Sequence, residues 1–139
     1  MNKGKNIAID SMILIYLIEG REPFCGAIKK ALESARHINF SSFGLGEVLA
    51  GFEKAGDKRG KIKFLSFVET YEKLSIIGFG KQEALIFAQL RAKYPSVKPP
   101  DAIHLATAIS GRVDGFLTND KNLMKVEELP ILRLDFIKG

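Results

Sequence analysis

The stretch Asn6-Ile7-Ala8-Ile9-Asp10-Ser11 places an aspartate and a serine directly after a short apolar segment that is typical of a buried strand. A helix is predicted over residues 11–19, ending at Gly20. Its apolar residues surround the whole circumference, so we expect it to be well buried. A short strand that leads directly into a helix is the repeating unit of parallel α/β sheets. The stretch therefore predicts an α/β fold with an acidic side chain at the carboxyl end of the first strand.

Short strand-like segments alternate with longer helical segments along the rest of the chain. Strands are expected at residues 37–40, 74–79, 116–118 and 131–134. Helices are expected at residues 23–36, from 41 or 42 to 55, at 58–73, 81–93 and 101–110, and from residue 121. We expect the segment at 74–79 to be buried and that at 131–134 to lie at an edge. The alternation predicts a parallel sheet flanked by helices, with residues 1–139 as a single domain.

Composition restricts the class of protein. Apolar residues make up 46% of the 139 residues, which is enough for a core. The longest apolar run near the N-terminus, residues 12–18, is too short to span a bilayer and lacks signal-peptide flanks, so we expect a cytoplasmic protein. Cys25 alone cannot form an internal disulfide and is interpreted as a small buried hydrophobe. His37 and His104 are too few for a histidine-ligated zinc site unless carboxylates complete it. Oxygen ligands would therefore do most of the binding of a metal, which favours Mg²⁺ or Mn²⁺.

The net charge of +5 suits an anionic partner without requiring one. The basic residues gather between positions 54 and 63. They are Lys54, Lys58, Arg59, Lys61 and Lys63. Two interpretations stay open for this cluster, namely a solvated helix face and a phosphate-binding ridge.

Three aspartates lie at similar places in the predicted layout. Asp10 and Asp120 each follow a strand, and Asp101 lies in the first turn of the helix that begins at Pro99-Pro100. Each suits the positive end of a helix dipole, so capping explains any one of them. Jointly they mean more, because the carboxyl ends of parallel strands form one edge, where ligands bind. If their strands are neighbours, Asp10 and Asp120 lie about 5–10 Å apart, a distance that suits a shared dication.

Other polar residues near these acids have two interpretations each. Glu47 lies about 200° around its helix from Leu45, away from the apolar stripe, so it is either solvent-exposed or a fourth acid of the site. His104 follows Asp101 on the same helix face. It is either packed in the core or able to orient a carboxylate or contact substrate. Thr118 and Asn119 suit turn chemistry or a hydrogen bond to a bound water or phosphate. Asp114 precedes its strand and is excluded from the site.

Four segments that carry these acids in order resemble the PIN-domain ribonucleases, and within them the VapC-type toxins of toxin–antitoxin pairs. The segments are residues 7–20, 41–51, 100–108 and 114–120. Any one of them is weakly specific, whereas all four in this order are characteristic of the family and cover nearly the whole chain. The family often has a polar residue two positions after the first acid. Met12 stands there in this sequence, which removes a local hydrogen bond.

The resemblance implies a three-layer α/β/α sandwich with a central, mainly parallel sheet. It implies that Asp10, Glu47, Asp101 and Asp120 are the catalytic residues and bind Mg²⁺ or Mn²⁺, with Ser11 supporting the first carboxylate. It further implies endoribonuclease activity on single-stranded RNA, a homodimer, and a small antitoxin partner that blocks the site. The basic cluster at positions 54–63, together with Arg21 or Arg112, is then expected to contact the RNA backbone.

The same residues also bear on three other functions. A phosphoacceptor receiver domain has two adjacent acids after its first strand and a Lys-Pro near its last, and neither is present here. A haloacid-dehalogenase-type phosphatase needs a second aspartate where Met12 stands. A PIN fold that binds RNA or acts as a scaffold without cleaving stays open, because fold alone does not dictate function. The RNA target also stays open, since no base-reading motif distinguishes transfer, ribosomal and messenger RNA.

Overall fold

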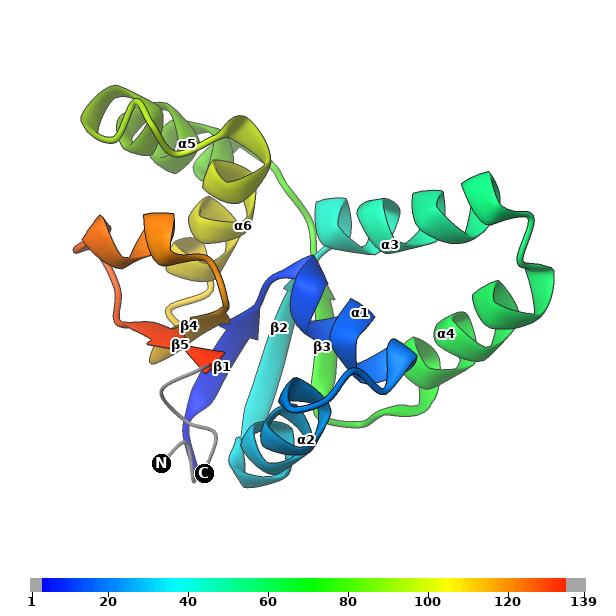
Figure 1. The fold of residues 1–139 in the computed structure, drawn as a ribbon. Helices are drawn as coiled ribbons and strands as arrows, with labels where there is room; N and C mark the ends of the chain where they lie inside the picture. Colours follow the sequence, from blue (N-terminus) through cyan, green and yellow to red (C-terminus); the bar gives the residue numbers. More distant parts are fainter. Residues whose placement is uncertain (1–3, 135–139) are drawn as a thin grey trace.

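A computed structural model describes residues 4–134, and a parallel sheet lies at its centre (Figure 1). Its five strands within these residues are β1 (Asn6–Ile9), β2 (His37–Ser41), β3 (Leu74–Ile77), β4 (Gly115–Thr118) and β5 (Ile131–Arg133). They are ordered β3-β2-β1-β4-β5, and every neighbouring pair is parallel. β1 is the central strand, so the chain runs outward from β1 to one edge and then returns to fill the other. The predicted α/β architecture with a parallel sheet is confirmed.

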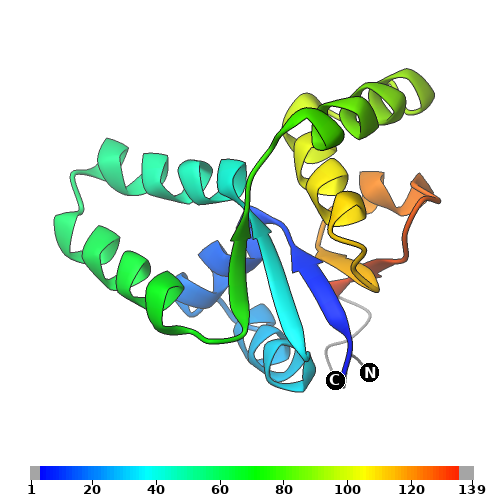
Figure 2. The same ribbon diagram turned by 180° about the vertical axis from the view of Figure 1, so that it is seen from behind.

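Helices cover both faces of the sheet, as the two opposite views show (Figures 1 and 2). One layer contains α1 (Ser11–Glu19), α2 (Phe24–Ser34), α3 (Ser42–Ala55) and α4 (Lys58–Thr70). The other contains α5 (Lys81–Lys93), α6 (Pro99–Ser110) and the 3₁₀ helix η1 (Lys121–Lys125). Side chains alternate between the faces of a strand. Ile7 and Ile9 of β1 therefore enter the core under α1–α4, whereas Ala8 between them enters the core under α5 and α6. The three-layer sandwich is confirmed.

The helix boundaries follow local sequence chemistry. Asp10 and Ser41 cap the starts of α1 and α3 through side-chain oxygens that accept backbone N–H groups. Gly20 and Gly56 end the same two helices in the left-handed conformation, which glycine adopts without steric cost. Both helix starts are thereby fixed at the carboxyl ends of β1 and β2, beside each other on one edge of the sheet.

Two burial predictions were wrong. The segment after residue 74 forms the edge strand β3, which is only half-buried, because an apolar run does not distinguish an edge strand from a central one. Helix α1 is buried on one side only, and Met12 and Ile18 are 40% and 44% exposed. Met12 and Ile18 border surface cavities rather than the core. The helix expected at 23–36 is shorter, since Ala35 is already extended.

Two further expectations concern composition. Cys25 is buried, as interpreted, and packs close to the carbonyl of Leu17. None of the helices in residues 4–134 has the length and apolar character needed to cross a membrane.

Candidate metal centre

The predicted acids line one pocket at the carboxyl edge of the sheet. β1 and β4 are adjacent and parallel, with Ile9 opposite Leu117, so the residues that follow both strands emerge side by side. This is also the point where the chain switches from one half of the sheet to the other, the usual ligand position in such folds. The pocket has a volume of about 470 Å³. It is lined by Asp10, Ser11, Met12, Tyr16, Glu47, Asp101, His104, Asn119 and Asp120.

Asp10 is the most buried of the four acids, with 7% of its surface exposed. Its Oδ1 accepts a hydrogen bond from the backbone N–H of Ile13 at 3.2 Å, and its Oδ2 accepts one from the Thr118 hydroxyl. Burial raises the pKa of Asp10 from 3.8 to about 6, although both hydrogen bonds act to lower it. Each oxygen keeps a second lone pair. Asp10 is therefore both the predicted helix cap and a carboxylate that gains from a nearby cation.

Asp101 and Asp120 complete the α6 and η1 side of the pocket. Asp101 lies in the first turn of α6, after two prolines that suit a helix start. Burial raises the pKa of Asp101, and the carboxylates of Asp120 and Glu47 raise it further. Asp120 caps η1 by accepting from the Asn122 N–H at 2.9 Å, while its own N–H donates to Thr118 Oγ1. The acids thus lie within electrostatic reach of one another.

Glu47 also lines the pocket and is only partly exposed, which agrees with the second of its two interpretations. Helix α3 turns Glu47 away from its own apolar stripe, but α1 and α6 lie on that side. Glu47 Oε1 accepts hydrogen bonds from Ser11 Oγ at 3.0 Å and from His104 Nε2 at 2.8 Å. Ser11 was expected to support the first carboxylate. It binds Glu47 instead, and Thr118 supports Asp10.

The donor set fits a hard divalent cation, but its geometry is not preformed. Four carboxylates supply the oxygen ligands that Mg²⁺ and Mn²⁺ prefer. Within residues 4–134, however, no three acidic, histidine or cysteine side chains are already grouped as a metal site. Bare carboxylates repel each other at short range, so the side chains are expected to close in only around a cation. Burial is the main cause of the raised pKa values of Asp10 and Asp101, and the neighbouring carboxylates add to the rise.

The basic cluster at positions 54–63 lies apart from this pocket. Within residues 4–134, none of these five basic residues lines the acidic pocket. Lys61 forms an ion pair with Glu53, and Lys63 borders a different cavity. Sequence reasoning missed Lys98, whose charge lowers the pKa of Asp101 from the start of α6. Asp114 accepts from the Asn6 N–H at the opposite edge of the sheet, so its exclusion is confirmed.

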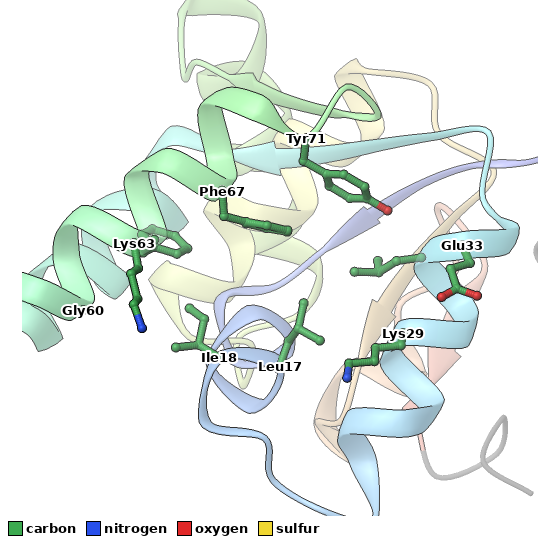
Figure 3. Close-up of a pocket in the computed structure, with 10 residues that line it drawn as sticks. Leu17, Ile18, Lys29, Glu33, Gly60, Lys63, Phe67 and Tyr71 are labelled. Atoms are coloured by element: carbon green, nitrogen blue, oxygen red, sulfur yellow. The ribbon is translucent and has the colours of Figure 1, made fainter.

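A second cavity, of about 570 Å³, is an apolar groove between α1, α2 and α4 (Figure 3). Figure 3 shows Leu17 and Ile18 of α1 facing Phe67 of α4. Lys29 and Lys63 lie at its margins. The groove shares no lining residue with the acidic pocket. The groove is lined by Leu17, Ile18, Lys29, Leu32, Glu33, Gly60, Lys63, Phe64, Phe67 and Tyr71.

Several solved structures have the same fold. A toxin–antitoxin complex from Klebsiella pneumoniae has a chain that is 28% identical, with a TM-score of 0.71, over 92% of this chain and 97% of that one. VapBC2 from Rickettsia felis, bound to a promoter DNA fragment, matches at 19% identity and a TM-score of 0.75, over 92% and 98% of the chains. A sarcin–ricin loop-cleaving VapC toxin from Mycobacterium tuberculosis matches at 15% identity and 0.67, over 89% and 98%.

No functionally curated protein matches the sequence. The family profile of the PIN domain matches residues 7–129, which is most of the chain and includes all four acids of the pocket. The sequence resemblance, the shared fold and the family match agree. The chain belongs to the PIN-domain family and has the fold of VapC-type toxins.

Proposed function

We propose that this protein is a Mg²⁺- or Mn²⁺-dependent endoribonuclease that cuts single-stranded RNA and serves as the toxin of a VapBC-type toxin–antitoxin pair. The observation that carries the proposal is the convergence of Asp10, Glu47, Asp101 and Asp120 on one pocket from four separate elements. Capping alone does not require four carboxylates to converge. Binding of a shared cation does require all four to converge, and the cation compensates the electrostatic repulsion between them.

The chain's own residues would hold the cation and orient the substrate. Asp10 and Asp101 are proposed as the main ligands, with Glu47 and Asp120 binding directly or through water. Once bound, the cation would neutralise the phosphodiester charge, polarise a phosphoryl oxygen and lower the pKa of a water molecule. The hydrogen bonds from Thr118 and Ile13 fix the orientation of the Asp10 carboxylate before the cation arrives. Hydrolysis is expected to leave a 5′-phosphate and a 3′-hydroxyl.

The RNA backbone would be attracted by the positive charge of the protein. Lys98 is placed to contact a phosphate beside the acids, because its charge already acts on Asp101. The basic residues near the turn between α3 and α4 would contact a strand farther from the cut. The hairpin of these helices projects from the sheet (Figure 1), and α3 carries Glu47 near its start. A single strand that follows α3 would therefore reach from the acids toward this basic end.

The apolar groove of Figure 3 is proposed as the docking site for one segment of the antitoxin. Blocking of the acidic pocket would need a further segment of the antitoxin, because groove and pocket share no lining residue. A cavity of about 570 Å³ lined by Leu17, Ile18 and Phe67 offers apolar contacts that an amphipathic helix can fill. The similar structures include toxin–antitoxin complexes, which is why an antitoxin is chosen as the occupant. Formation of a homodimer is a separate proposal that rests on the family resemblance.

The test is a cleavage assay on an end-labelled single-stranded RNA. The wild-type protein should cut in Mg²⁺ or Mn²⁺ and stop in EDTA. Asp101→Asn should lose at least about 100-fold in rate, because it removes a ligand of the charge-stabilising cation. Asp114→Asn is the matched control, since Asp114 is an exposed acid at the opposite edge of the sheet, and it should keep its rate. Full activity of Asp101→Asn would reject the site, whereas RNA binding without cleavage by the wild type would favour the RNA-binding alternative.

A further inference from the structure

His104 is a buried imidazole with a partner on each ring nitrogen. It lies on α6 one turn after Asp101, and its side chain is 3% exposed. Its Nδ1 lies 2.7 Å from Ser41 Oγ, and its Nε2 lies 2.8 Å from Glu47 Oε1. Ser41 and Glu47 are the cap and the second turn of α3. His104 therefore connects the helix that carries Asp101 to the helix that carries Glu47.

The chemistry of the partners fixes the direction of the hydrogen bond to Glu47 and favours one direction for the hydrogen bond to Ser41. The Glu47 carboxylate can only accept, so His104 Nε2 must carry a proton and donate to it. Ser41 Oγ accepts from the Gly44 N–H at 2.9 Å, and among the described contacts His104 Nδ1 is the acceptor within reach of the serine hydroxyl proton. In this arrangement every donor has an acceptor when the ring is neutral. The Ser41 hydroxyl thus selects the tautomer that presents its N–H to Glu47.

Glu47 is held from two sides through the same oxygen. Oε1 accepts from His104 Nε2 and also from Ser11 Oγ, which lies beside Asp10 on α1. Both hydrogen bonds are made to Oε1, and Oε2 accepts none among the described contacts. Oε2 is therefore available to another partner. This fixes the carboxylate between the segments that carry Asp10 and Asp101.

The sequence makes room for this imidazole. A Cβ atom at Gly44 would lie 2.9 Å from His104 Cε1 and 2.6 Å from the Phe40 ring, which is too close for ordinary contact. Phe43 meets the imidazole edge to face, with ring centroids 5.7 Å apart. The missing side chain at Gly44 thus leaves space for the imidazole of His104 at the start of α3, and the aromatic neighbours pack around it.

We propose that His104 is a positioning residue that orients Glu47 as a metal ligand, with its tautomer selected by Ser41. This inference rests on the proposed function, because it assumes that Glu47 binds the cation. Mutation of a residue that hydrogen-bonds a metal ligand commonly weakens metal affinity by about 10- to 100-fold. An effect of that size is expected here for loss of the imidazole donor.

The experiment measures Mn²⁺ binding by calorimetry, without RNA, for the wild type and two variants. His104→Leu keeps an apolar side chain and removes the donor, so its dissociation constant should rise about 10- to 100-fold. His104→Gln places an amide N–H as far along the side chain as Nε2, so it should bind within about threefold of the wild type. His37→Gln is the control, because His37 bonds Ser75 on the sheet rather than an acid of the pocket, and it should bind like the wild type.

The outcomes separate this inference from the proposed function. Equal Mn²⁺ affinity of wild type and His104→Leu would overturn the role of His104 and leave the metal centre standing. Absence of binding by the wild type would overturn both. A nitrogen-15 NMR spectrum of the metal-free wild type gives a readout that does not depend on any variant folding. It should show His104 protonated at Nε2 and bare at Nδ1, and the opposite tautomer would also overturn the inference.

Discussion

Replacing Asp10 with asparagine should stabilise the metal-free protein at neutral pH, even though it removes a proposed metal ligand. Asp10 is buried, and burial raises its pKa from 3.8 to about 6. The folded protein therefore binds this proton more tightly than the unfolded chain. The contribution of Asp10 to the free energy of unfolding is fully present below pH about 4. It is lost as pH rises through about 6, because the ionised carboxylate is less stable in its buried position than in the unfolded chain.

The magnitude follows from the pKa. A rise from 3.8 to about 6 corresponds to about 3 kcal/mol of stability lost above pH 6. Asparagine carries no charge, caps a helix as well as aspartate does, and can keep an acceptor for the Ile13 N–H. Its hydrogen bond with Thr118 is weaker than that of aspartate, which reduces the gain in stability by about 1 kcal/mol. The net expectation is a gain of about 2 kcal/mol, or a Tm higher by roughly 5–8 °C.

The assay is urea and thermal unfolding in EDTA at pH 7.5 and at pH 4. Asp10→Asn should be more stable than the wild type at pH 7.5. At pH 4, where the wild-type carboxyl is mostly protonated, this gain should be absent, and the weaker Thr118 hydrogen bond should leave the variant less stable by up to about 1 kcal/mol. Asp57→Asn is the control, because Asp57 caps α4 in the same way but is exposed. It should change stability by less than about 0.5 kcal/mol.

Addition of Mn²⁺ should reverse the order of the two proteins. The wild type gains stability from ligand binding by mass action, whereas Asp10→Asn lacks the ligand. An Asp10→Asn protein that is no more stable than the wild type at pH 7.5, or equally stabilised at both pH values, would refute the reasoning that burial of this charge is costly.

Three other predictions follow from the same geometry. Mn²⁺ affinity measured by calorimetry should increase from pH 5 to pH 7.5 and level off above the pKa of Asp10, about 6, because a proton competes with the cation below it; a flat profile would contradict this. Gly44→Ala should lower the free energy of unfolding by about 1–3 kcal/mol because its methyl group has no room, whereas Gly46→Ala, with open space around it, should raise it slightly. Ile18→Asp should abolish co-purification with the product of a small neighbouring antitoxin gene, and Leu85→Asp on α5 should not, although both side chains are exposed; equal retention would reject the groove.

The order of the elements was readable from the sequence because apolar periodicity reports local structure. The strand at Asn6–Ile9 and the helix at Ser11–Glu19 were predicted with their observed bounds. Asp10 and Asp120 were placed on one edge because both follow parallel strands. The prediction assumed that β1 and β4 are neighbours, and the structure shows that they are. Local sequence could not establish this, because it depends on the path of the chain across the sheet.

Glu47 and His104 show where local reasoning ended. Helix geometry predicted that Glu47 leaves the apolar stripe of α3, but what lies on its other side is decided by the packing of α1 and α6. The same holds for His104, whose partners Ser41 and Glu47 are far from it in sequence. Gly44 leaves room for a close approach, and the groups that approach it are the imidazole of His104 and the Phe40 ring.

The most direct test is anomalous diffraction from a crystal of the protein soaked in Mn²⁺. The account predicts a manganese peak in the acidic pocket, within about 2.0–2.6 Å of carboxylate oxygens of Asp10 and Asp101. It also predicts that Asp101→Asn crystals lose the peak. Manganese found only elsewhere, or a pocket that stays free of manganese while the acids are ionised, would contradict the claim that these four carboxylates are gathered to bind a dication.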